Sequence, residues 1–317
     1  MQHFTSIKDV AQPETLLELA KTIKARPFDF QPFGKNKTLG LLFLNPSLRT
    51  RMSTQKAAQN LGMNVMVMNL NSEGWNIELE DGTIMDQGSQ EHIKEAAGVI
   101  SQYCDIIGIR TFASLKSREE DYGEKILNKF IQHAQVPIIS LESATLHPLQ
   151  SLADWLTIEE QKKVQRPKVV LSWAPHPRAL PQAVANSFVE WMKQASVELI
   201  VAHPPGFELA APFVTGVNTT TDQLSAFADA DFIYAKNWSS YENYGAIGQN
   251  LSHWIIDQAK MELTQGGQFM HCLPVRRNVV VSDAVLDGNS SIVLEQANNR
   301  TYAAQAVLLA MCGGLGQ

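Results

Sequence analysis

Short apolar segments alternate with longer amphipathic segments through most of this 317-residue chain. Near-continuous apolar runs are typical of strands buried on both faces of a parallel sheet, and the segments between them are typical of the covering helices. The sequence predicts strands at 39–44, 64–70, 105–109, 136–140, 168–173, 197–201, 231–235, 268–271 and 292–294. It predicts helices at 14–25, 52–61, 91–103, 119–134, 182–195, 222–228, 251–263 and 298–311. The fold class is therefore α/β.

The strand pattern breaks near residues 142–154, after the fourth predicted strand. A chain of this length exceeds the usual size of one hydrophobic core. We therefore expect two doubly wound parallel-sheet domains, 1–146 and 147–297, with ligands at the carboxyl ends of the strands. By the residue pattern alone, the last predicted helix could pack on either domain.

Composition argues against several classes of protein. The formal charge of −6 argues against a nucleic-acid or acidic-membrane partner. No apolar run approaches the roughly 20 residues of a membrane helix, and the first residues do not resemble a signal peptide. The cysteines, Cys104, Cys272 and Cys312, lack metal-type spacing. We expect reduced thiols, no metal and a soluble cytoplasmic protein.

The segment Ser47-Leu48-Arg49-Thr50-Arg51 lies between a predicted strand and a predicted helix. A helix N-terminus has free N–H groups and a partial positive charge, and arginine matches the paired oxygens of phosphate. Ser47 is expected to cap the helix. The segment predicts an oxyanion site, and the alternative is a capped surface helix with two solvated arginines.

Two further polar segments follow predicted strands. Arg110 comes directly after the strand at 105–109, where the fold places ligands, although a solvated loop arginine is the alternative. In His147-Pro148-Leu149-Gln150, Pro148 suits a first helical turn. An imidazole and a carboxamide can polarise a carbonyl and hold an amide NH2. The alternative is a structural histidine near a domain hinge, with its hydrogen bonds made within the protein.

Two more segments belong to the second half of the chain. His271-Cys272-Leu273-Pro274 follows a predicted strand, and a cis Leu273–Pro274 bond would turn backbone carbonyls toward a ligand. We do not expect Cys272 to be a nucleophile, because no histidine–acid pair accompanies it. The proline-rich loop at 174–181 presents His176 and Arg178 with little loss of entropy, unless it is only a rigid connection.

Together these segments resemble the carbamoyltransferase family. Residues 47–51 resemble its Ser-x-Arg-Thr-Arg carbamoyl-phosphate signature, residues 147–150 its His-Pro-x-Gln box, and residues 271–274 the His-Cys-Leu-Pro box of the ornithine branch. Residues 295–300 resemble the Glu-x-x-Asn-Arg stretch near the family's C-terminus. The four motifs span nearly the whole chain in the family's order.

The details resemble the N-acylornithine branch of that family. Residues 238–245 lack the Asp-x-x-x-Ser-Met-Gly loop that ordinary ornithine enzymes use for a free α-amino group. Three features of the chain are similar to those of the acylornithine enzymes: Trp75, the proline-rich loop around His176, and Lys236. The resemblance implies a knotted C-terminal domain, and we expect residues 298–317 to complete the first domain.

The resemblance also implies roles for individual residues. Those implied to bind carbamoyl phosphate are Ser47, Leu48, Arg49, Thr50, Trp75, Arg110, His147, Gln150, Cys272, Leu273 and Arg300. Those implied to bind the acylornithine are Glu142, His176, Lys236, Cys272, Leu273, Arg276 and Gln90. Trp75 would reach in from a neighbouring subunit of a homotrimer.

By the same resemblance, the δ-amine of the acceptor attacks the carbamoyl carbon and phosphate leaves, as a step of arginine biosynthesis. The implied catalytic residues are Thr50, Arg110, His147 and Gln150. Arg110, Thr50 and His147 are donors for the developing oxyanion, and such donors are worth roughly 2.7–4 kcal/mol each. Neither a cofactor nor a covalent intermediate is expected.

Gln90 bears on the acyl group of the acceptor. In this branch, its position is acidic in acetyl-specific relatives and proline in succinyl-specific ones, and a carboxylate there would repel a succinyl group. Because Gln90 is neutral, we expect transfer to N-succinyl-L-ornithine, which gives N-succinyl-L-citrulline. N-acetyl-L-ornithine is the alternative, because the neighbouring Glu91 is an acid. Ordinary ornithine is a more distant alternative.

Two other classes of protein share this pattern. A dinucleotide-dependent dehydrogenase needs a glycine-rich turn after a strand, and the chain has no Gly-x-Gly-x-x-Gly. A non-catalytic ligand-binding homologue would keep the fold but lose polar groups, whereas Arg49, Arg110, His147, Gln150 and Arg300 are all present.

Overall fold

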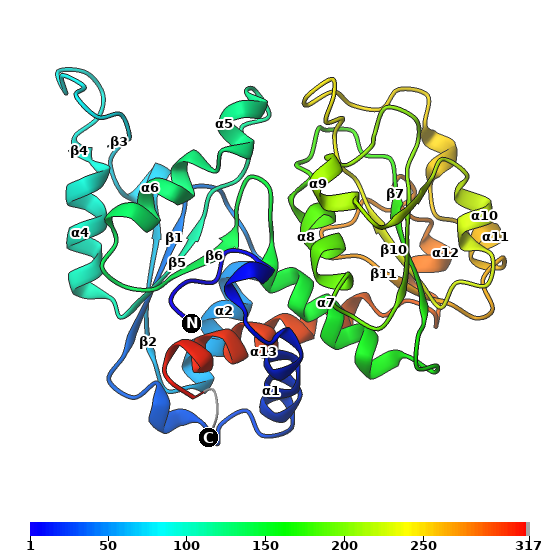
Figure 1. Ribbon diagram of the computed structural model, residues 1–317, viewed down its shortest axis with the longest axis horizontal. Helices are drawn as coiled ribbons and strands as arrows, with labels where there is room; N and C mark the ends of the chain where they lie inside the picture. Colours follow the sequence, from blue (N-terminus) through cyan, green and yellow to red (C-terminus); the bar gives the residue numbers. More distant parts are fainter. Residues whose placement is uncertain (315–317) are drawn as a thin grey trace. The chain divides into compact units, whose positions relative to one another are not determined.

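The computed structural model describes residues 1–314, and the chain divides into two compact units (Figure 1). The first unit contains residues 1–113, 119–149 and those from Arg300 onward, and the second contains 114–118 and 150–299. The predicted domains differ from these units by residues 114–118, 147–149 and 298–299. Among residues 1–314, no helix is both long and apolar enough to span a membrane.

The first unit is built on a four-stranded parallel sheet of order β2-β1-β5-β6. Its strands are β1 (Thr38–Phe43), β2 (Asn64–Asn69), β5 (Ile106–Arg110) and β6 (Ile138–Glu142). A separate parallel pair consists of β3 (Ile77–Glu78) and β4 (Glu91–His92). Its helices are η1 (Ile7–Asp9), α1 (Pro13–Ala25), η2 (Gln31–Phe33), α2 (Arg49–Asn60), α3 (Leu70–Glu73), α4 (Ile93–Tyr103), α5 (Arg118–Tyr122, from the second residue) and α6 (Lys125–His133).

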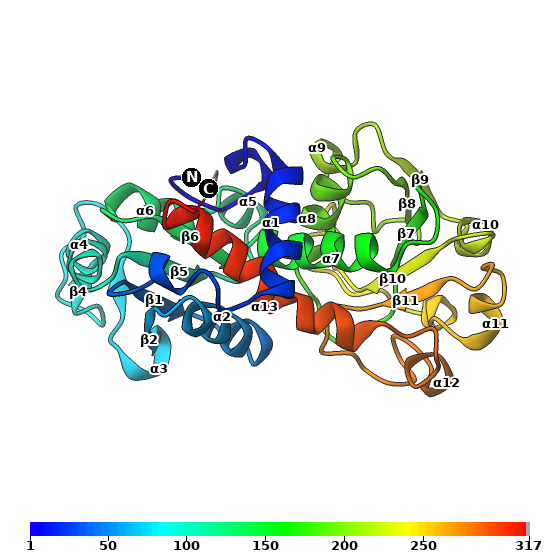
Figure 2. The ribbon, with the colours of Figure 1, turned by 90° about the horizontal axis from the view of Figure 1, so that it is seen from below.

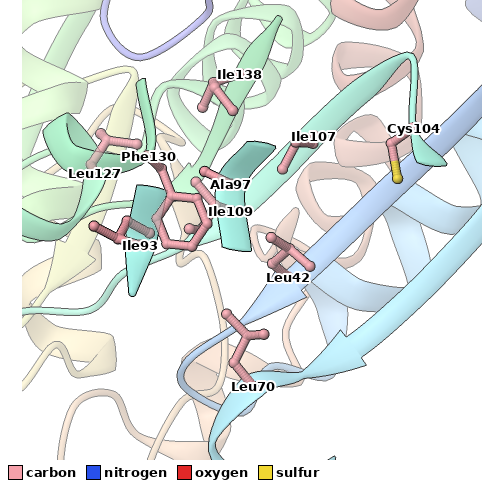
Figure 3. Packing of buried hydrophobic residues seen from close by; sticks show 10 residues of the cluster. All are labelled: Leu42, Leu70, Ile93, Ala97, Cys104, Ile107, Ile109, Leu127, Phe130 and Ile138. Carbon is pink, nitrogen blue, oxygen red and sulfur yellow. The ribbon is translucent and has the colours of Figure 1, made fainter. Parts of the chain in front are cut away.

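Helices α4 and α6 cover one face of this sheet. Ile93 and Ala97 of α4 and Leu127 and Phe130 of α6 join the strands in one buried cluster (Figure 3). The strand members of the cluster are Leu42, Ile107, Ile109 and Ile138. Burial of such side chains contributes about 1.5–3 kcal/mol each, which holds the strand ends in fixed positions.

The opposite face is covered by α1, α2 and the last part of α13 (Val293–Met311), which lie together in Figures 1 and 2. The buried Asn60 of α2 donates from Nδ2 to Gln305 Oε1 of α13 at 3.0 Å. Gln305 Nε2 in turn donates to the Pro27 carbonyl, after α1, at 2.6 Å. Because these amides are buried and paired, α13 is tied into the first unit from Arg300 onward.

The second unit is built on a five-stranded parallel sheet of order β11-β10-β7-β8-β9. Its strands are β7 (Lys168–Trp173), β8 (Glu198–Ala202), β9 (Asn218–Thr220), β10 (Phe232–Lys236) and β11 (Gln268–Met270). Its helices, besides the start of α13, are α7 (Pro148–Gln161, from the third residue), α8 (Ala183–Met192), α9 (Ala211–Val214), α10 (Gln223–Phe227), η3 (Ser252–Trp254), α11 (Gln258–Met261) and α12 (Asp283–Leu286). Both units confirm the predicted pair of parallel-sheet α/β folds.

Helices cover both faces of the second sheet. Phe188 of α8 packs edge-on against Tyr234 of β10, with ring centroids 4.7 Å apart. Gln223 of α10 donates to Ser172 Oγ of β7 at 2.9 Å. Ser172 pairs in register with Ala235, so it lies on the face opposite to Tyr234.

Several predicted elements were wrong. The predicted strand at 292–294 lies at the start of α13, because a three-residue apolar run cannot distinguish a strand from a helix. The predicted helix at 251–263 contains only η3 and α11, and Asp257 caps α11 by accepting from Lys260 N at 3.0 Å. Strand β9 was missed because its residues are polar. The predicted helix at 119–134 is broken at Glu124, whose φ is 48°.

Candidate functional site

The first candidate site begins where β1 leads into α2. Leu48 already has helical backbone angles, and no side chain caps the helix. The expectation that Ser47 caps α2 is therefore wrong, because the helix begins at Arg49 with Leu48 in the cap position. Thr50 is buried and Leu48 is exposed. The first N–H groups of α2 are thus left without a side-chain cap, as an anion site requires.

Arg300 meets this helix start inside the first unit. Its Nη2 donates to Thr50 Oγ1 at 2.6 Å, and both residues are buried. Arg51 lies in the same turn of α2, but its Nη1 bonds to Asn69 Oδ1, at the end of β2, at 3.4 Å. The structure thus brings together Thr50 and Arg300 of the predicted phosphate residues, whereas Arg51 has a partner elsewhere.

Arg110, Glu142 and His147 form a second group at the carboxyl ends of neighbouring strands. Arg110 ends β5 and Glu142 ends β6, and the two pair across a register shift. Arg110 Nη1 lies 2.5 Å from Glu142 Oε2, and His147 Nε2 lies 3.7 Å from the same oxygen. Arg110 Nε is buried and has no hydrogen-bond partner within residues 1–314. A buried guanidinium with an unpaired N–H is suited to an oxygen of a ligand.

Glu124 holds the segment that connects Glu142 to His147. Its carboxylate accepts from Ser143 Oγ at 2.6 Å, from Thr145 N at 2.8 Å and from Ala144 N at 3.2 Å, and also from the Thr145 hydroxyl. Burial raises the pKa of this carboxyl, and the four hydrogen bonds oppose that effect. Glu124 was missed because nothing in its local sequence indicates a partner some 20 residues away.

Trp75 and Gln90 lie on the loop that contains β3 and β4. The side chain of Trp75 is 56% exposed, and its indole Nε1 donates to Glu91 Oε2 at 2.7 Å. These three residues line one open hollow of about 710 Å³ with Met85, His92 and Glu95. Gln90 and the acidic Glu91 therefore share one hollow.

The outer part of this loop is held by ion pairs. Asp81 lies 2.5 Å from Lys94 Nζ of α4 and 3.1 Å from Lys129 Nζ of α6. Hydrogen bonds to these two lysines lower the pKa of Asp81 to about 2. Lys125 of α6 pairs with Glu80 in the same way. Ion pairs thus connect the loop to two helices of its own unit, α4 and α6.

In the second unit, cations gather around His176. Arg276 Nε donates to His176 Nε2 at 3.2 Å, and His176 Nδ1 lies 2.9 Å from the Arg178 carbonyl oxygen. Burial lowers the pKa of His176, and the charges of Lys236, Arg276 and Arg178 add to this effect. Lys236, which ends β10, is 8% exposed. Within residues 1–314, no carboxylate pairs with any of these three cations, so the group favours an anionic ligand.

The other predicted residues lie directly after β11 and in the first turn of α7, where the second unit resumes at Gln150. The Leu273–Pro274 bond is cis, as the sequence indicated, and Cys272 forms no disulfide within residues 1–314. Pro148 is the first residue of α7, as predicted. Gln150 lies in the same turn, fully buried, and its Nε2 donates to Asp154 Oδ1 at 2.7 Å.

Two family models match the chain. The one described as "Aspartate/ornithine carbamoyltransferase, carbamoyl-P binding domain" matches residues 2–160. The one described as "Aspartate/ornithine carbamoyltransferase, Asp/Orn binding domain" matches residues 181–311. An N-succinylornithine carbamoyltransferase of Bacteroides fragilis is 51% identical over 310 residues, covering 97% of this chain and 98% of that protein. An N-acetylornithine carbamoyltransferase of Xanthomonas campestris pv. campestris is 33% identical, covering 99% and 98%.

Solved structures of similar enzymes share the fold. An acetylornithine transcarbamylase complexed with acetylcitrulline has a TM-score of 0.93 and 33% identity, and the match covers 100% of both chains. A Glu-to-Ala variant of N-acetyl-L-ornithine transcarbamylase, complexed with carbamyl phosphate and N-succinyl-L-norvaline, has a TM-score of 0.91 and 33% identity. That match covers 98% of this chain and 100% of the other.

Proposed function

The chain belongs to the aspartate/ornithine carbamoyltransferase family, and we propose that it transfers the carbamoyl group of carbamoyl phosphate to the δ-amine of N-succinyl-L-ornithine. The products are N-succinyl-L-citrulline and phosphate. N-acetyl-L-ornithine is the alternative acceptor, because relatives named for each of the two acceptors are similar to this chain. One experiment can compare the two acceptors.

The observation that carries the choice of acceptor is the group of three cations around His176. N-succinyl-L-ornithine has two carboxylates and N-acetyl-L-ornithine has one. Lys236, Arg276 and Arg178 have no acidic partner within residues 1–314, and charge-assisted hydrogen bonds to carboxylates are about twice as strong as neutral ones. A doubly anionic acceptor therefore gains more from this group than a singly anionic one.

The first unit supports the proposal for carbamoyl phosphate. The uncapped start of α2, with Ser47, Leu48, Arg49 and Thr50, offers N–H groups and a guanidinium to the phosphate, and Arg300 adds a second guanidinium. Arg110 and His147 offer donors to the carbamoyl oxygen, which gains negative charge as the δ-amine attacks. Gln150, Cys272 and Leu273 are proposed to hold the remaining polar atoms of the carbamoyl group.

The test compares three acceptors at saturating carbamoyl phosphate. We expect the highest kcat/KM with N-succinyl-L-ornithine, a value lower by about tenfold or more with N-acetyl-L-ornithine, and little turnover with ornithine. The measurement is the initial rate of formation of each citrulline product. A preference for the acetyl compound would overturn the acyl assignment, and turnover with ornithine alone would overturn the choice of branch.

Gln90→Glu serves as the companion variant for that test. A carboxylate at this position would stand beside Glu91 in the hollow that Trp75 also lines, and it would repel a succinyl carboxylate. The ratio of kcat/KM for the succinyl over the acetyl compound is therefore expected to fall. Gln87→Glu, on the same loop but not among the lining residues of that hollow, is the matched control.

We also propose a homotrimer in which Trp75 completes the site of a neighbouring copy. Trp75 is 56% exposed, and large apolar side chains are exposed around the start of α2 and on the edge strand β2. These side chains are Leu48, Met52, Met66 and Met68. Exposed apolar groups on neighbouring elements favour contact with another protein surface, here a second copy.

Subunit mixing tests this assembly. Trp75→Ala and Arg110→Met chains are expected to be nearly inactive when pure. After the two are dissociated, mixed in equal amounts and reassembled, chance pairing should give about a quarter of the sites an intact Trp75 and Arg110. Activity should therefore reappear. A mixture that stays as inactive as its components would contradict the sharing of sites, and a monomeric mass by light scattering would contradict the trimer.

A further inference from the structure

Asp154 is a fully buried carboxylate for which the proposed reaction has no role so far. It lies on α7, one turn after Gln150, and is 0% exposed. Its Oδ1 accepts from Gln150 Nε2 at 2.7 Å and from Gln296 Nε2 at 2.7 Å. One carboxylate oxygen therefore receives the NH2 groups of two buried amides.

This arrangement determines which way each amide points. An ionised carboxylate can only accept hydrogen bonds, so both amides must turn their NH2 groups toward Asp154. The carbonyl oxygen of each amide then faces away from it. For Gln150, which is itself fully buried, this presents Oε1 as an acceptor and excludes the flipped amide. An acceptor suits an NH2 group of a ligand and does not suit an oxyanion.

The second amide connects Asp154 to the segment after β11. Gln296 Oε1 accepts from the backbone N–H of His271 at 2.9 Å. His271 Nδ1 accepts from the backbone N–H of Leu273 at 2.9 Å. Asp154 thus fixes Gln296, Gln296 holds His271, and His271 holds the residue before the cis bond.

Tyr234 lies beside the same carboxylate. It is fully buried on β10, and its pKa is raised well above the usual value by burial and then by the nearby charge of Asp154. The charge is therefore enclosed by groups from α7, β10 and α13. Taking a carboxylate out of water costs several kcal/mol. Such a cost favours a function beyond packing.

We propose that Asp154 is a positioning residue that orients Gln150 as an acceptor for the carbamoyl NH2 and, through Gln296, holds the segment 271–273 in place. This inference rests on the proposed function. It adds a specificity element, because inorganic phosphate shares the phosphate group of carbamoyl phosphate but has no NH2 group for Gln150 to recognise.

The experiment measures binding of carbamoyl phosphate and of inorganic phosphate to the full-length wild-type protein and to Asp154→Asn. The asparagine has the same size but can also donate, so it no longer dictates the orientation of either amide. We expect the affinity for carbamoyl phosphate to fall by about tenfold to a hundredfold and the affinity for phosphate to stay within about twofold.

Two further variants allow the inference to be tested even if Asp154→Asn folds poorly. Gln296→Met removes the link to His271 and keeps Gln150 on Asp154, so we expect a higher KM for the acylornithine with an unchanged affinity for phosphate. Thr157→Ala is the matched control, because Thr157 is buried on the same helix and accepts from Asn299 Nδ2 at 2.9 Å. It should lower the melting temperature without changing either affinity.

The outcomes separate the inference from the function on which it rests. Selective loss of carbamoyl phosphate binding in Asp154→Asn supports the inference. If Asp154→Asn loses affinity for both ligands equally, or for neither, the inference is overturned. The proposed function still stands in that case if the wild-type protein catalyses carbamoyl transfer. Unchanged acylornithine KM in Gln296→Met overturns the part that concerns residues 271–273. Absence of carbamoyl transfer by the wild-type protein overturns the proposed function and the inference together.

Discussion

Replacement of Arg110 by methionine is expected to lower kcat for carbamoyl transfer by about 10²–10³-fold, as removal of one oxyanion donor does in other enzymes. Arg110 is buried at the end of β5, beside Glu142 and near His147. Its unpaired Nε, within residues 1–314, is available to a ligand oxygen. Methionine keeps most of the side-chain volume and removes every donor.

The measurement is the single-turnover rate at saturating substrates. Loss of Arg110 also leaves the buried Glu142 carboxylate with His147 as its one remaining basic neighbour within residues 1–314. Breaking a buried ion pair lowers the free energy of unfolding by about 3–5 kcal/mol. The double variant Arg110→Met/Glu142→Gln removes that leftover charge, so it should recover stability without recovering activity. Arg51→Met is the control, because Arg51 bonds to Asn69 instead. A rate within about threefold of the wild type in Arg110→Met would exclude Arg110 from the reaction.

Replacement of Arg276 by methionine is expected to lower kcat/KM for N-succinyl-L-ornithine by about 10–100-fold, the range for hydrogen bonds to charged groups. The loss with N-acetyl-L-ornithine should be smaller, because that acceptor has one carboxylate fewer. The substitution also removes a cation and a hydrogen bond beside His176. Since the charge of Arg276 helps to lower the pKa of His176, that pKa should rise in the variant, which NMR titration of the imidazole can follow.

The neighbouring Arg277 supplies the matched control. Its guanidinium lies 2.8 Å from Asp283 and 2.6 Å from Asp287, and its side chain is half exposed. Arg277→Met should therefore leave both kcat/KM values and the pKa of His176 unchanged. Equal losses with both acceptors in Arg276→Met would place Arg276 at the shared α-carboxylate and would contradict its role in acyl selection.

The sequence was sufficient to predict two α/β units, each built on a parallel sheet. Parallel strands buried on both faces require apolar residues at nearly every position, so β1, β5, β7 and β10 were recognised from short apolar runs. The carboxyl ends of such strands face the ligand side, so Arg110 was placed by its position after an apolar run, whereas Lys236 was identified from the resemblance to the acylornithine enzymes.

Tertiary structure alone decided how these residues are paired. The resemblance assigned Glu142 to the acceptor but carried no sign that Glu142 pairs with Arg110 and lies near His147. Glu124 interrupts a predicted helix to hold residues 143–145, and Asp154 orients two amides. Local periodicity reports which side of an element is buried. It carries no information about which polar group, distant in sequence, satisfies a buried donor or charge, because that depends on how the elements pack.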